Sequence, residues 1–208
     1  MKIIDLTHHI KPDMAVFPGT EQPVFQKIDI EGYRELKMTL YTHTGTHMDA
    51  PYHIINNART LDAFPIDKFT GRAMVIDCRN LTNEKITTDF LAPFEERIAR
   101  ISFLLLNSGW HAKWNTPEYF GNFPTLTAEA ALWLTKFNLK GIGLDTISLD
   151  PVTDMALPNH HIVLKNEILI IENLTNLNSL PSGEFTFQCF PLKIENADGS
   201  PVRAVAIV

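Results

Sequence analysis

The sequence predicts an α/β domain with a mixed sheet, on three observations. Short runs rich in Val, Ile, Leu and Phe recur along the chain and are bounded by Gly, Pro, Asn or Asp. Only two stretches carry clear helical patterning. The 13 Pro and 10 Gly among 208 residues favour turns and extended segments over an all-helical chain. Neither a repeat nor a linker divides the sequence, so we expect a single domain over residues 1–208.

The predicted strands are short and rich in apolar residues. Six runs meet this description: residues 36–42, 72–78, 101–106, 141–147, 168–171 and 185–191. A sheet of this kind, with only two helices between its strands, is more typical of a mixed sheet than of a regular doubly wound one.

Two stretches predict helices. Thr87 or Thr88 could cap a helix that runs to residue 98, where Pro93 is tolerable because it falls in the first turns. Thr127 precedes a second helix over residues 128–137, which Gly141 follows. Its apolar side chains share one face at i, i+3, i+4 and i+7, so we interpret them as core: Ala130, Trp133, Leu134 and Phe137.

Composition excludes several classes of partner. A formal net charge of −6 argues against a nucleic-acid surface and against a polybasic membrane patch. The first nine residues include Asp5, His8 and His9 where a secretory signal would be apolar, which favours the cytoplasm. Both cysteines, Cys78 and Cys189, lie in apolar strand-like runs and are expected to be buried free thiols.

The most informative stretch holds three histidines and an aspartate within eleven positions. A helix is disfavoured there by β-branched threonines, by Gly45 between the first two histidines and by Pro51. An extended backbone instead places side chains alternately on two sides, so one side would collect His43, His47, Asp49 and His53. Imidazole nitrogens and carboxylate oxygens are ligands for zinc, manganese and iron. The alternative, a polar surface loop, fits isolated histidines such as His8, His9 and His111 better than it fits this cluster.

The stretch resembles the signature of the cyclase-like metal-dependent hydrolases, which include bacterial kynurenine formamidases and isatin hydrolases. That signature, His-x-Gly-Thr-His-x-Asp-x-Pro-x-His, is matched from His43 to His53. Similarity to later landmarks of the family extends over the whole chain: Ile4 to Thr7, Phe17 to Gly19, Asn107 to Trp110, Gly143 to Asp150, His160–His161 and Ile168 to Leu174.

The resemblance implies a role for each matched position. His43, His47 and Asp49 are then metal ligands, with Asp49 bridging two ions, and His53 is the general acid and base. His160 and Glu172 are implied as ligands of a second ion, although some members of the family hold one. The implied fold is a swivelling β/β/α-type domain, and the implied assembly is a homodimer or homotetramer.

The residues themselves support the second pair less strongly. Glu172 ends the buried run 168–171, which suits a ligand and also an ordinary strand end. His160 and His161 cannot both face one site, because neighbouring side chains diverge in a strand and in a helix. Pro158 suggests a turn or a helix start just before them. The resemblance favours His160 as the ligand and a structural role for His161.

These expectations predict a metal-dependent hydrolase of an amide-like bond in a small molecule, such as an aryl formamide or a cyclic imide or amide. One or two divalent ions, zinc before manganese or iron, would lower the pKa of water so that hydroxide attacks the carbonyl carbon, while His53 protonates the leaving nitrogen. Two other hypotheses stay open, a cyclase or lyase of a small oxygenated substrate and a metal-binding module without catalysis. Residues 54–59 depart from the acidic, glycine-containing continuation of dedicated kynurenine formamidases, which leaves the substrate open. Phe17, Tyr52 and Trp110 are candidates for the pocket wall or for packing.

Overall fold

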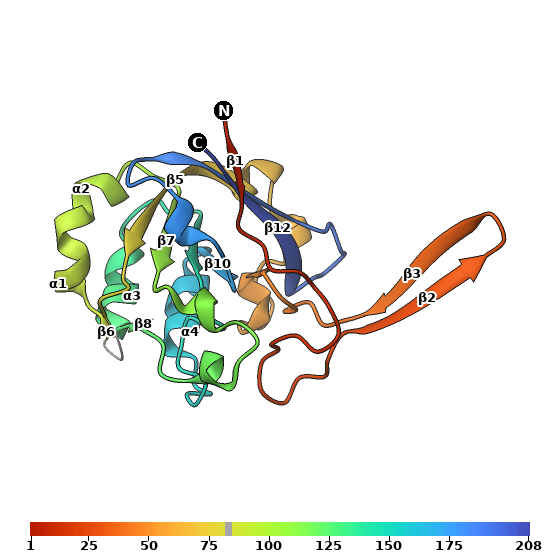
Figure 1. Ribbon diagram of the computed structural model, residues 1–208. Helices are drawn as coiled ribbons and strands as arrows, with labels where there is room; N and C mark the ends of the chain where they lie inside the picture. The colour runs from red at the N-terminus through yellow and green to blue at the C-terminus, as the bar shows by residue number, and fades with distance from the viewer. Residues whose placement is uncertain (82–84) are drawn as a thin grey trace.

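The computed structural model describes residues 1–81 and 85–208 and has a mixed sheet that closes on itself (Figure 1). The α/β class with a mixed sheet is therefore confirmed. The strand order is β1-β12-β11-β5-β7-β9-β10-β4, and β12 also pairs with β4, so seven strands form a closed, barrel-like sheet. The main-sheet strands are β1 (Ile3–Asp5), β4 (His47–Asp49), β5 (Thr70–Asp77), β7 (Phe103–Asn107), β9 (Gly141–Leu144), β10 (Leu169–Glu172), β11 (Phe185–Pro191) and β12 (Gly199–Ile207).

Parallel and antiparallel pairings divide the sheet. Strands β5, β7, β9 and β10 run parallel, and the remaining pairings, including those of β4 with β10 and β12, are antiparallel. A two-stranded parallel sheet of β6 (Lys85–Ile86) and β8 (Thr125–Leu126) lies apart from the barrel. The short strand β4 therefore closes the barrel, and it is the strand that carries two of the predicted ligands.

Two apolar cores cover the two faces of the parallel strands. In β7, Phe103 and Leu105 belong to the core inside the barrel, whereas Leu104 and Leu106 belong to the core under the helices. This alternation follows from the period of two in a strand. It also explains why the run is continuously apolar, since each successive side chain is buried on one face or the other.

Four helices pack against the outer face of the parallel strands: α1 (Thr88–Leu91), α2 (Glu95–Ile98), α3 (Ala128–Leu134) and α4 (Pro158–Lys165). The single helix expected from Thr87 to residue 98 is wrong. Thr87 does cap its start, but a 3-10 turn containing Pro93 separates α1 from α2, because proline removes a helical hydrogen bond. Thr127 caps α3 as expected, and that helix ends at Leu134, three residues early.

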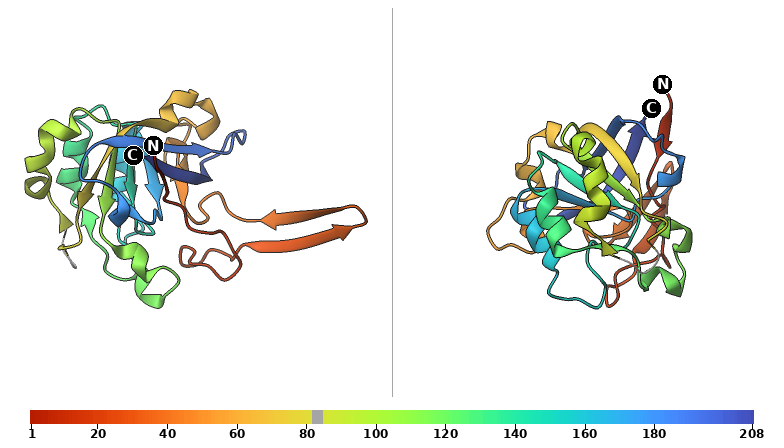
Figure 2. Two further views of the ribbon diagram at one scale, coloured as in Figure 1. Left: turned by 45° about the horizontal axis from the view of Figure 1, so that its top comes forward. Right: turned by 90° about the vertical axis from the view of Figure 1, so that its left-hand side faces the viewer.

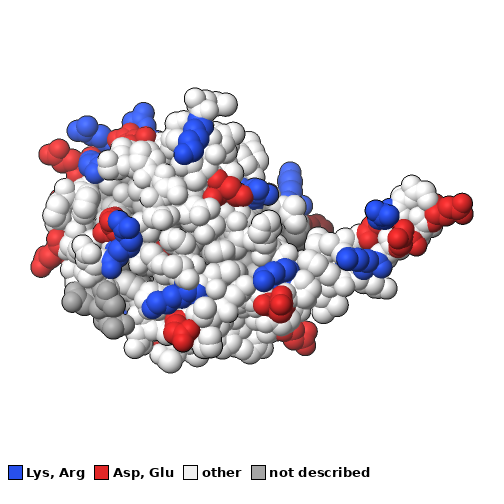
Figure 3. Space-filling model, viewed as in Figure 1, with Lys and Arg blue, Asp and Glu red and all other residues white. Residues whose placement is uncertain are grey.

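A hairpin of β2 (Val24–Ile30) and β3 (Tyr33–Thr39) projects from the body, as the left view of Figure 2 and the orange ribbon of Figure 1 show. The strand expected over residues 36–42 overlaps β3, but the chain leaves the strand after Thr39 to enter the turn before His43. Every residue of β2 and β3 is exposed or half-buried. On the face drawn in Figure 3, basic and acidic side chains are interspersed over the body and the hairpin.

The two cysteines are free thiols buried in the apolar cores, as the sequence predicts. Burial raises the pKa of both thiols. Within residues 1–81 and 85–208, the helices are too short or too polar to cross a bilayer.

Candidate metal centre

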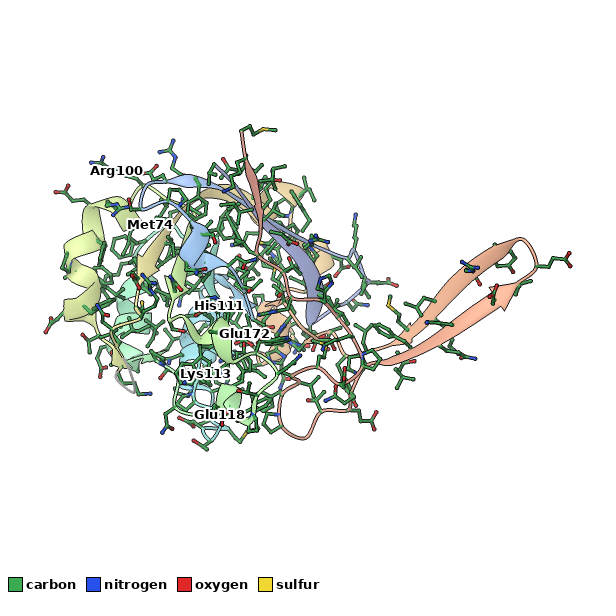
Figure 4. The ribbon with its side chains drawn as sticks, viewed as in Figure 1. Met74, Arg100, His111, Lys113, Glu118 and Glu172 are labelled. Atoms are coloured by element: carbon green, nitrogen blue, oxygen red, sulfur yellow. The ribbon has the colours of Figure 1, made fainter. Side chains whose placement is uncertain are left out.

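Strand β4 brings the centre of the motif into the barrel. His47 and Asp49 lie two residues apart in β4 and therefore share a face. In the antiparallel pairing of β4 with β10, His47 stands opposite Glu172. Cross-strand neighbours lie within side-chain reach of one another, so the sheet register alone joins the motif to a residue 125 positions later. Figure 4 shows Glu172 in the interior of the body.

The extended run expected over residues 43–53 is wrong at both ends. Gly45 has a φ of +67°, and residues Pro51–His53 form a 3-10 turn, so only residues 47–49 are a strand. The glycine is required by this left-handed conformation. A Cβ on Gly45 would meet Met14 and Ile10, not the space between the histidines. The four side chains converge because the backbone turns, not because it stays extended.

His43 and His53 approach the strand from these two turns. Nδ1 of His43 lies 2.7 Å from Oδ1 of Asp49. The ring of His53 lies 4.0 Å from that of His43, measured between centroids, and His53 is half-buried. The motif is therefore one cluster in space, as the spacing predicts.

The second predicted pair completes the cluster from the other side. Nε2 of His160 lies 3.3 Å from Oε1 of Glu172 and 3.9 Å from Oδ2 of Asp49. His160 lies in the first turn of α4 and is buried, while His161 diverges from it in the helix and is exposed. The helix was missed as a full element because its start is held by Asp150, eight residues upstream of Pro158. That carboxylate accepts from the backbone N–H groups of Asn159 and His160.

Asp49 belongs to both halves of the cluster. Its carboxylate can join one group of ligand atoms with His43 and His47 and another with His160 and Glu172, and each group fits within 4.8 Å. Its Oδ2 atom is buried and has no hydrogen-bond partner among the described residues. A buried carboxylate oxygen without a partner costs several kcal/mol unless a cation or proton meets it. The donor set therefore fits one divalent cation in either of the two groups, or one in each group with Asp49 common to both.

The outward nitrogens of two histidines are already occupied. Nδ1 of His47 donates to the carbonyl of Gly45 at 2.8 Å, and Nδ1 of His160 donates to Oδ2 of Asp150 at 2.7 Å. The Gly45 carbonyl also accepts from Nδ2 of Asn173. These bonds fix the tautomers so that Nε2 of each ring faces the centre, which is the usual arrangement around metal-binding histidines.

The charges in the cluster shift its pKa values strongly. Burial lowers the pKa of His43, but Asp49 and Asp198 outweigh it and raise that pKa to about 10. Burial likewise lowers the pKa of His160, and hydrogen bonds with Asp150 and Glu172 raise it to about 10. Burial raises the pKa of Asp49, yet His43 and His47 hold it well below its usual range. Without an ion, protons on histidine supply the positive charge that the carboxylates require.

A cavity of about 250 Å³ opens onto the cluster. Four of the histidines and Glu172 are among its polar lining residues, and Phe17 is among its apolar ones. The full lining is Ala15, Val16, Phe17, Thr20, Tyr41, His43, His47, His53, Ile147, Ser148, Met155, Leu157, His160, Glu172 and Asn173. Of the three aromatic candidates, only Phe17 lines this cavity. Trp110 packs in a core with Tyr119, and Tyr52 is exposed.

The remaining histidines lie outside the cluster, as expected for isolated ones. His8 stacks on Trp114 with 4.1 Å between ring centroids, and burial lowers its pKa to about 4. His111 contacts Asp145 at 3.1 Å, and His9 is exposed. One residue of the site was missed by the sequence analysis. Asp198, from the C-terminal region, faces both His43 and His53.

Comparison with known proteins decides the family. Residues 4–151 match a family model described as "Putative cyclase". The chain belongs to the cyclase family. A kynurenine formamidase of Bacillus anthracis is 34% identical over 98% of this chain and 96% of its own length. One from Bacillus mycoides is also 34% identical, over 97% of this chain and 95% of its own.

Solved structures of the cyclase family have the same fold. Isatin hydrolase A of Ralstonia solanacearum superposes with a TM-score of 0.87 at 27% identity, covering 99% of this chain and 91% of that one. A structure described as a potential metal-dependent hydrolase with cyclase activity gives a TM-score of 0.79 at 25% identity, covering 99% and 96%. The chain is thus a metal-dependent hydrolase of carbon–nitrogen bonds other than peptide bonds, with a divalent metal cofactor and a small-molecule substrate.

Proposed function

We propose that this enzyme hydrolyses an aryl formamide or a cyclic amide, holding one or two divalent ions with His43, His47, Asp49, His160 and Glu172. His53 is the proposed general acid and base. The observation that carries the proposal is the Asp49 carboxylate, which is shared by two groups of ligand atoms and keeps Oδ2 without a partner among the described residues. The substrate class is taken from the relatives, which are kynurenine formamidases and isatin hydrolases.

The cavity supports a small planar substrate. A volume of about 250 Å³ suits a molecule of one or two rings, and the apolar side offers Phe17, Ile147 and Leu157 to such a ring. The polar side would meet the scissile carbonyl. Residues 54–59 do not contribute to this lining, and four of them border a separate groove with Glu167. Their departure from the formamidase pattern therefore does not bear directly on the substrate.

A divalent cation supplies Lewis acidity at this place, because it polarises a carbonyl oxygen and acidifies water. Zinc is the proposed ion, since imidazole nitrogens and carboxylate oxygens suit it, and manganese and iron accept the same ligands. His53 lines the cavity beside the cluster and would carry the proton. His53 takes a proton as the water oxygen joins the carbonyl carbon and returns it to the nitrogen as the carbon–nitrogen bond breaks, and the second proton of the water is released with the carboxylate product. A formamide then yields formate and an amine, and a cyclic amide opens to an amino acid salt.

We further propose that the enzyme is one domain over residues 1–208 that assembles as a homodimer or homotetramer through the β2–β3 hairpin. Both ends of the described chain pair in the same sheet, where β1 lies against β12, which supports a single domain. The hairpin exposes several large apolar side chains, among them Val24, Ile30, Tyr33, Leu36 and Met38. A two-stranded hairpin is marginal alone in water. Its three basic and three acidic residues balance, so two copies would meet without net repulsion.

The function is tested by product analysis. Metal-free protein is loaded with zinc, manganese or ferrous iron and offered aryl formamides, cyclic imides, lactams and lactones in ¹⁸O-labelled water. A hydrolase places one ¹⁸O atom in the carboxylate product. Turnover without label would instead indicate a cyclase or lyase. Metal binding with no turnover of any compound would favour a non-catalytic module, and failure to bind metal would refute the site. Glu129→Ala, which removes an exposed carboxylate on α3, is the control variant and should bind metal and turn over substrate like the wild type.

A further inference from the structure

Asp198 lies at the edge of the metal cluster, which consists of the side chains of His43, His47, Asp49, His53, His160 and Glu172. It comes immediately before β12. Its Oδ2 atom is 3.0 Å from Nε2 of His43 and 3.7 Å from Nδ1 of His53. Its Oδ1 atom accepts a hydrogen bond from the hydroxyl of Thr42 at 2.9 Å. One carboxylate therefore faces a proposed metal ligand and the proposed proton shuttle at once.

The backbone holds this carboxylate in place. The carbonyl of Asp198 accepts from the N–H of Ala50 at 2.8 Å, and Gly199 pairs with Asp49 in the β12–β4 ladder. A Cβ on Gly199 would come within 2.7 Å of Cε1 and 2.9 Å of Nε2 of His43. Such a distance is shorter than van der Waals contact, so the His43 ring can take this position only against a glycine. Asp198 and Gly199 thus form a seat for that ring.

The seat determines which nitrogen of His43 can meet an ion. An ionised carboxylate only accepts hydrogen bonds, so Nε2 of His43 must carry the proton that it donates to Asp198. In a neutral ring Nδ1 is then the free nitrogen, and Nδ1 is the atom that lies 2.7 Å from Oδ1 of Asp49. The hydrogen bonds of His43, His47 and His160 follow one rule. In each ring the nitrogen that faces away from the centre donates a hydrogen bond. The acceptors are, in the same order, Asp198, the Gly45 carbonyl and Asp150.

The same oxygen of Asp198 also faces the ring of His53. Nδ1 of His53 is the ring nitrogen that faces this carboxylate, at 3.7 Å, and the negative charge favours a proton on Nδ1, which leaves Nε2 to exchange protons with a substrate. We propose that Asp198 is a positioning residue that orients His43 for metal binding and His53 for proton transfer through a single carboxylate. This inference rests on the proposed metal site.

The test compares substitutions of Asp198 with a matched acidic residue of the same loop, the exposed Glu195. The variants are Asp198→Ala, Asp198→Asn and, as control, Glu195→Gln. Metal affinity is measured by competition with a chelator, and kcat and KM are measured at saturating metal. Circular dichroism checks the fold of each variant. Because Asp198 is half-buried and belongs to neither apolar core, its substitution should leave both cores intact.

We expect Asp198→Ala to weaken metal binding about 10- to 100-fold, the usual effect of losing a partner of a metal-bound histidine. At saturating metal, kcat should still fall at least about 10-fold with KM changed less than about threefold, since His53 is misoriented while the cavity wall is intact. Asp198→Asn keeps one acceptor oxygen and should recover part of the metal affinity. Glu195→Gln should match the wild type in both measurements.

A second variant tests the seat without touching the carboxylate. Gly199→Ala places a methyl group against His43 and should weaken metal binding while Asp198 is still present. Wild-type metal affinity and kcat in Asp198→Ala would overturn the inference. Loss of one bound ion in excess zinc, with kcat unchanged, would make Asp198 a ligand of an extra ion beside His43 and His53 and would also overturn it. Failure of the wild type to bind metal would instead remove the proposed function itself.

Discussion

The metal cluster and the β2–β3 hairpin depart from the usual distribution of polarity in opposite directions. The cluster buries groups that prefer water: His47, Asp49, His160 and Glu172 are each at most 5% exposed. The hairpin exposes groups that avoid water, with Tyr33 and Met38 each 53% exposed. Ionisable residues are rarely buried without a partner, and contiguous apolar surface is rarely left open.

In the proposed enzyme, each region is completed by something that the single chain lacks. Positive charge would satisfy the oxygens of the cluster, and apolar surface from a second copy would cover the hairpin. The two additions are different in kind, and so are the experiments that separate them. Changes in the cluster should alter metal content and turnover, while changes in the hairpin should alter assembly.

Asp49→Ala is expected to have the largest effect. It removes the carboxylate common to both groups of ligand atoms, so most of the bound metal should be lost. Metal catalysis is worth several kcal/mol, which corresponds to a loss of roughly 10³-fold or more in kcat. Elemental analysis of the purified variant measures the first effect and steady-state kinetics the second. Normal metal content would refute Asp49 as a ligand.

His53→Ala should leave the metal in place and remove the proton shuttle. General acid–base catalysis typically contributes about 10²–10⁴-fold, and kcat should fall by that factor. The matched variant is Tyr52→Ala, which removes the exposed neighbouring ring and should retain turnover. Metal loss in His53→Ala would move His53 into the ligand set, and unchanged turnover would remove it from the mechanism.

The two adjacent histidines of α4 test which of them belongs to the ligand set. His160 faces Glu172 and is buried, whereas His161 is exposed on the same helix. His160→Ala should weaken metal binding by about 100-fold or more, since a ligand matters at least as much as its supporting partner. His161→Ala should change the affinity less than about threefold. Chelator competition gives both numbers, and the reverse ranking would transfer the ligand role to His161.

The charge of the cluster predicts how metal binding depends on pH. The pKa values of His43 and His160 are raised to about 10 in the metal-free protein, so both rings are protonated at pH 7. They bind an ion only when neutral, so loading at pH 7 should release up to two protons per chain. Release should decline as the pH approaches 10. Titration calorimetry in buffers of different ionisation enthalpy counts these protons, and zero release at pH 7 would contradict the assignment.

The same shifts set the stability of the metal-free protein. A histidine whose pKa is raised on folding stabilises the fold fully below its ordinary pKa of 6.5, and this contribution is lost as the pH rises through about 10. The Tm of the metal-free protein should therefore fall between pH 7 and pH 10 more than that of the loaded protein.

The hairpin should affect the chemistry least. Leu36→Glu combined with Met38→Glu places two charges on one face of β3 and should convert the assembly to monomers, as measured by light scattering. Metal content should stay at the wild-type value. Leu132→Glu, at a leucine on α3 that is also exposed, is the control and should leave the assembly unchanged. A monomeric wild type would remove the proposed role of the hairpin.

The sequence predicted most of the sheet because buried strands are read from continuous apolar runs. The range 185–191 coincides with β11, and the runs at 72–78 and 101–106 differ from β5 and β7 by one or two residues at each end. The sequence analysis missed β12, whose buried residues alternate with half-buried or exposed ones behind a Gly-Ser-Pro start that is more typical of a loop. Strand β4 is only three residues long and is defined by its partners, not by its own pattern.

The candidate site was predictable where its residues are close in sequence. The motif from His43 to His53 joined four groups by spacing, and the resemblance supplied His160 and Glu172. Asp198 carries no local signal of this kind, because its contacts with His43 and Thr42 span 155 and 156 positions. Such a contact is set by the pairing of β12 with β4, which only the folded sheet creates.

The closure of the barrel by β4 has a consequence for the synthesis of the protein. Strand β4 pairs with Ile170–Glu172 and with Gly199–Pro201. More than 100 further residues must therefore be synthesised before the first motif can pair. On the ribosome, His43, His47 and Asp49 emerge long before the segments that enclose them, and contacts of such long range form late in folding. With the proposed ligands, the enclosed site exists only after the last strand has docked. Acquisition of the metal would mark the end of folding, and a chain stalled before residue 199 would lack the enclosure needed to retain it.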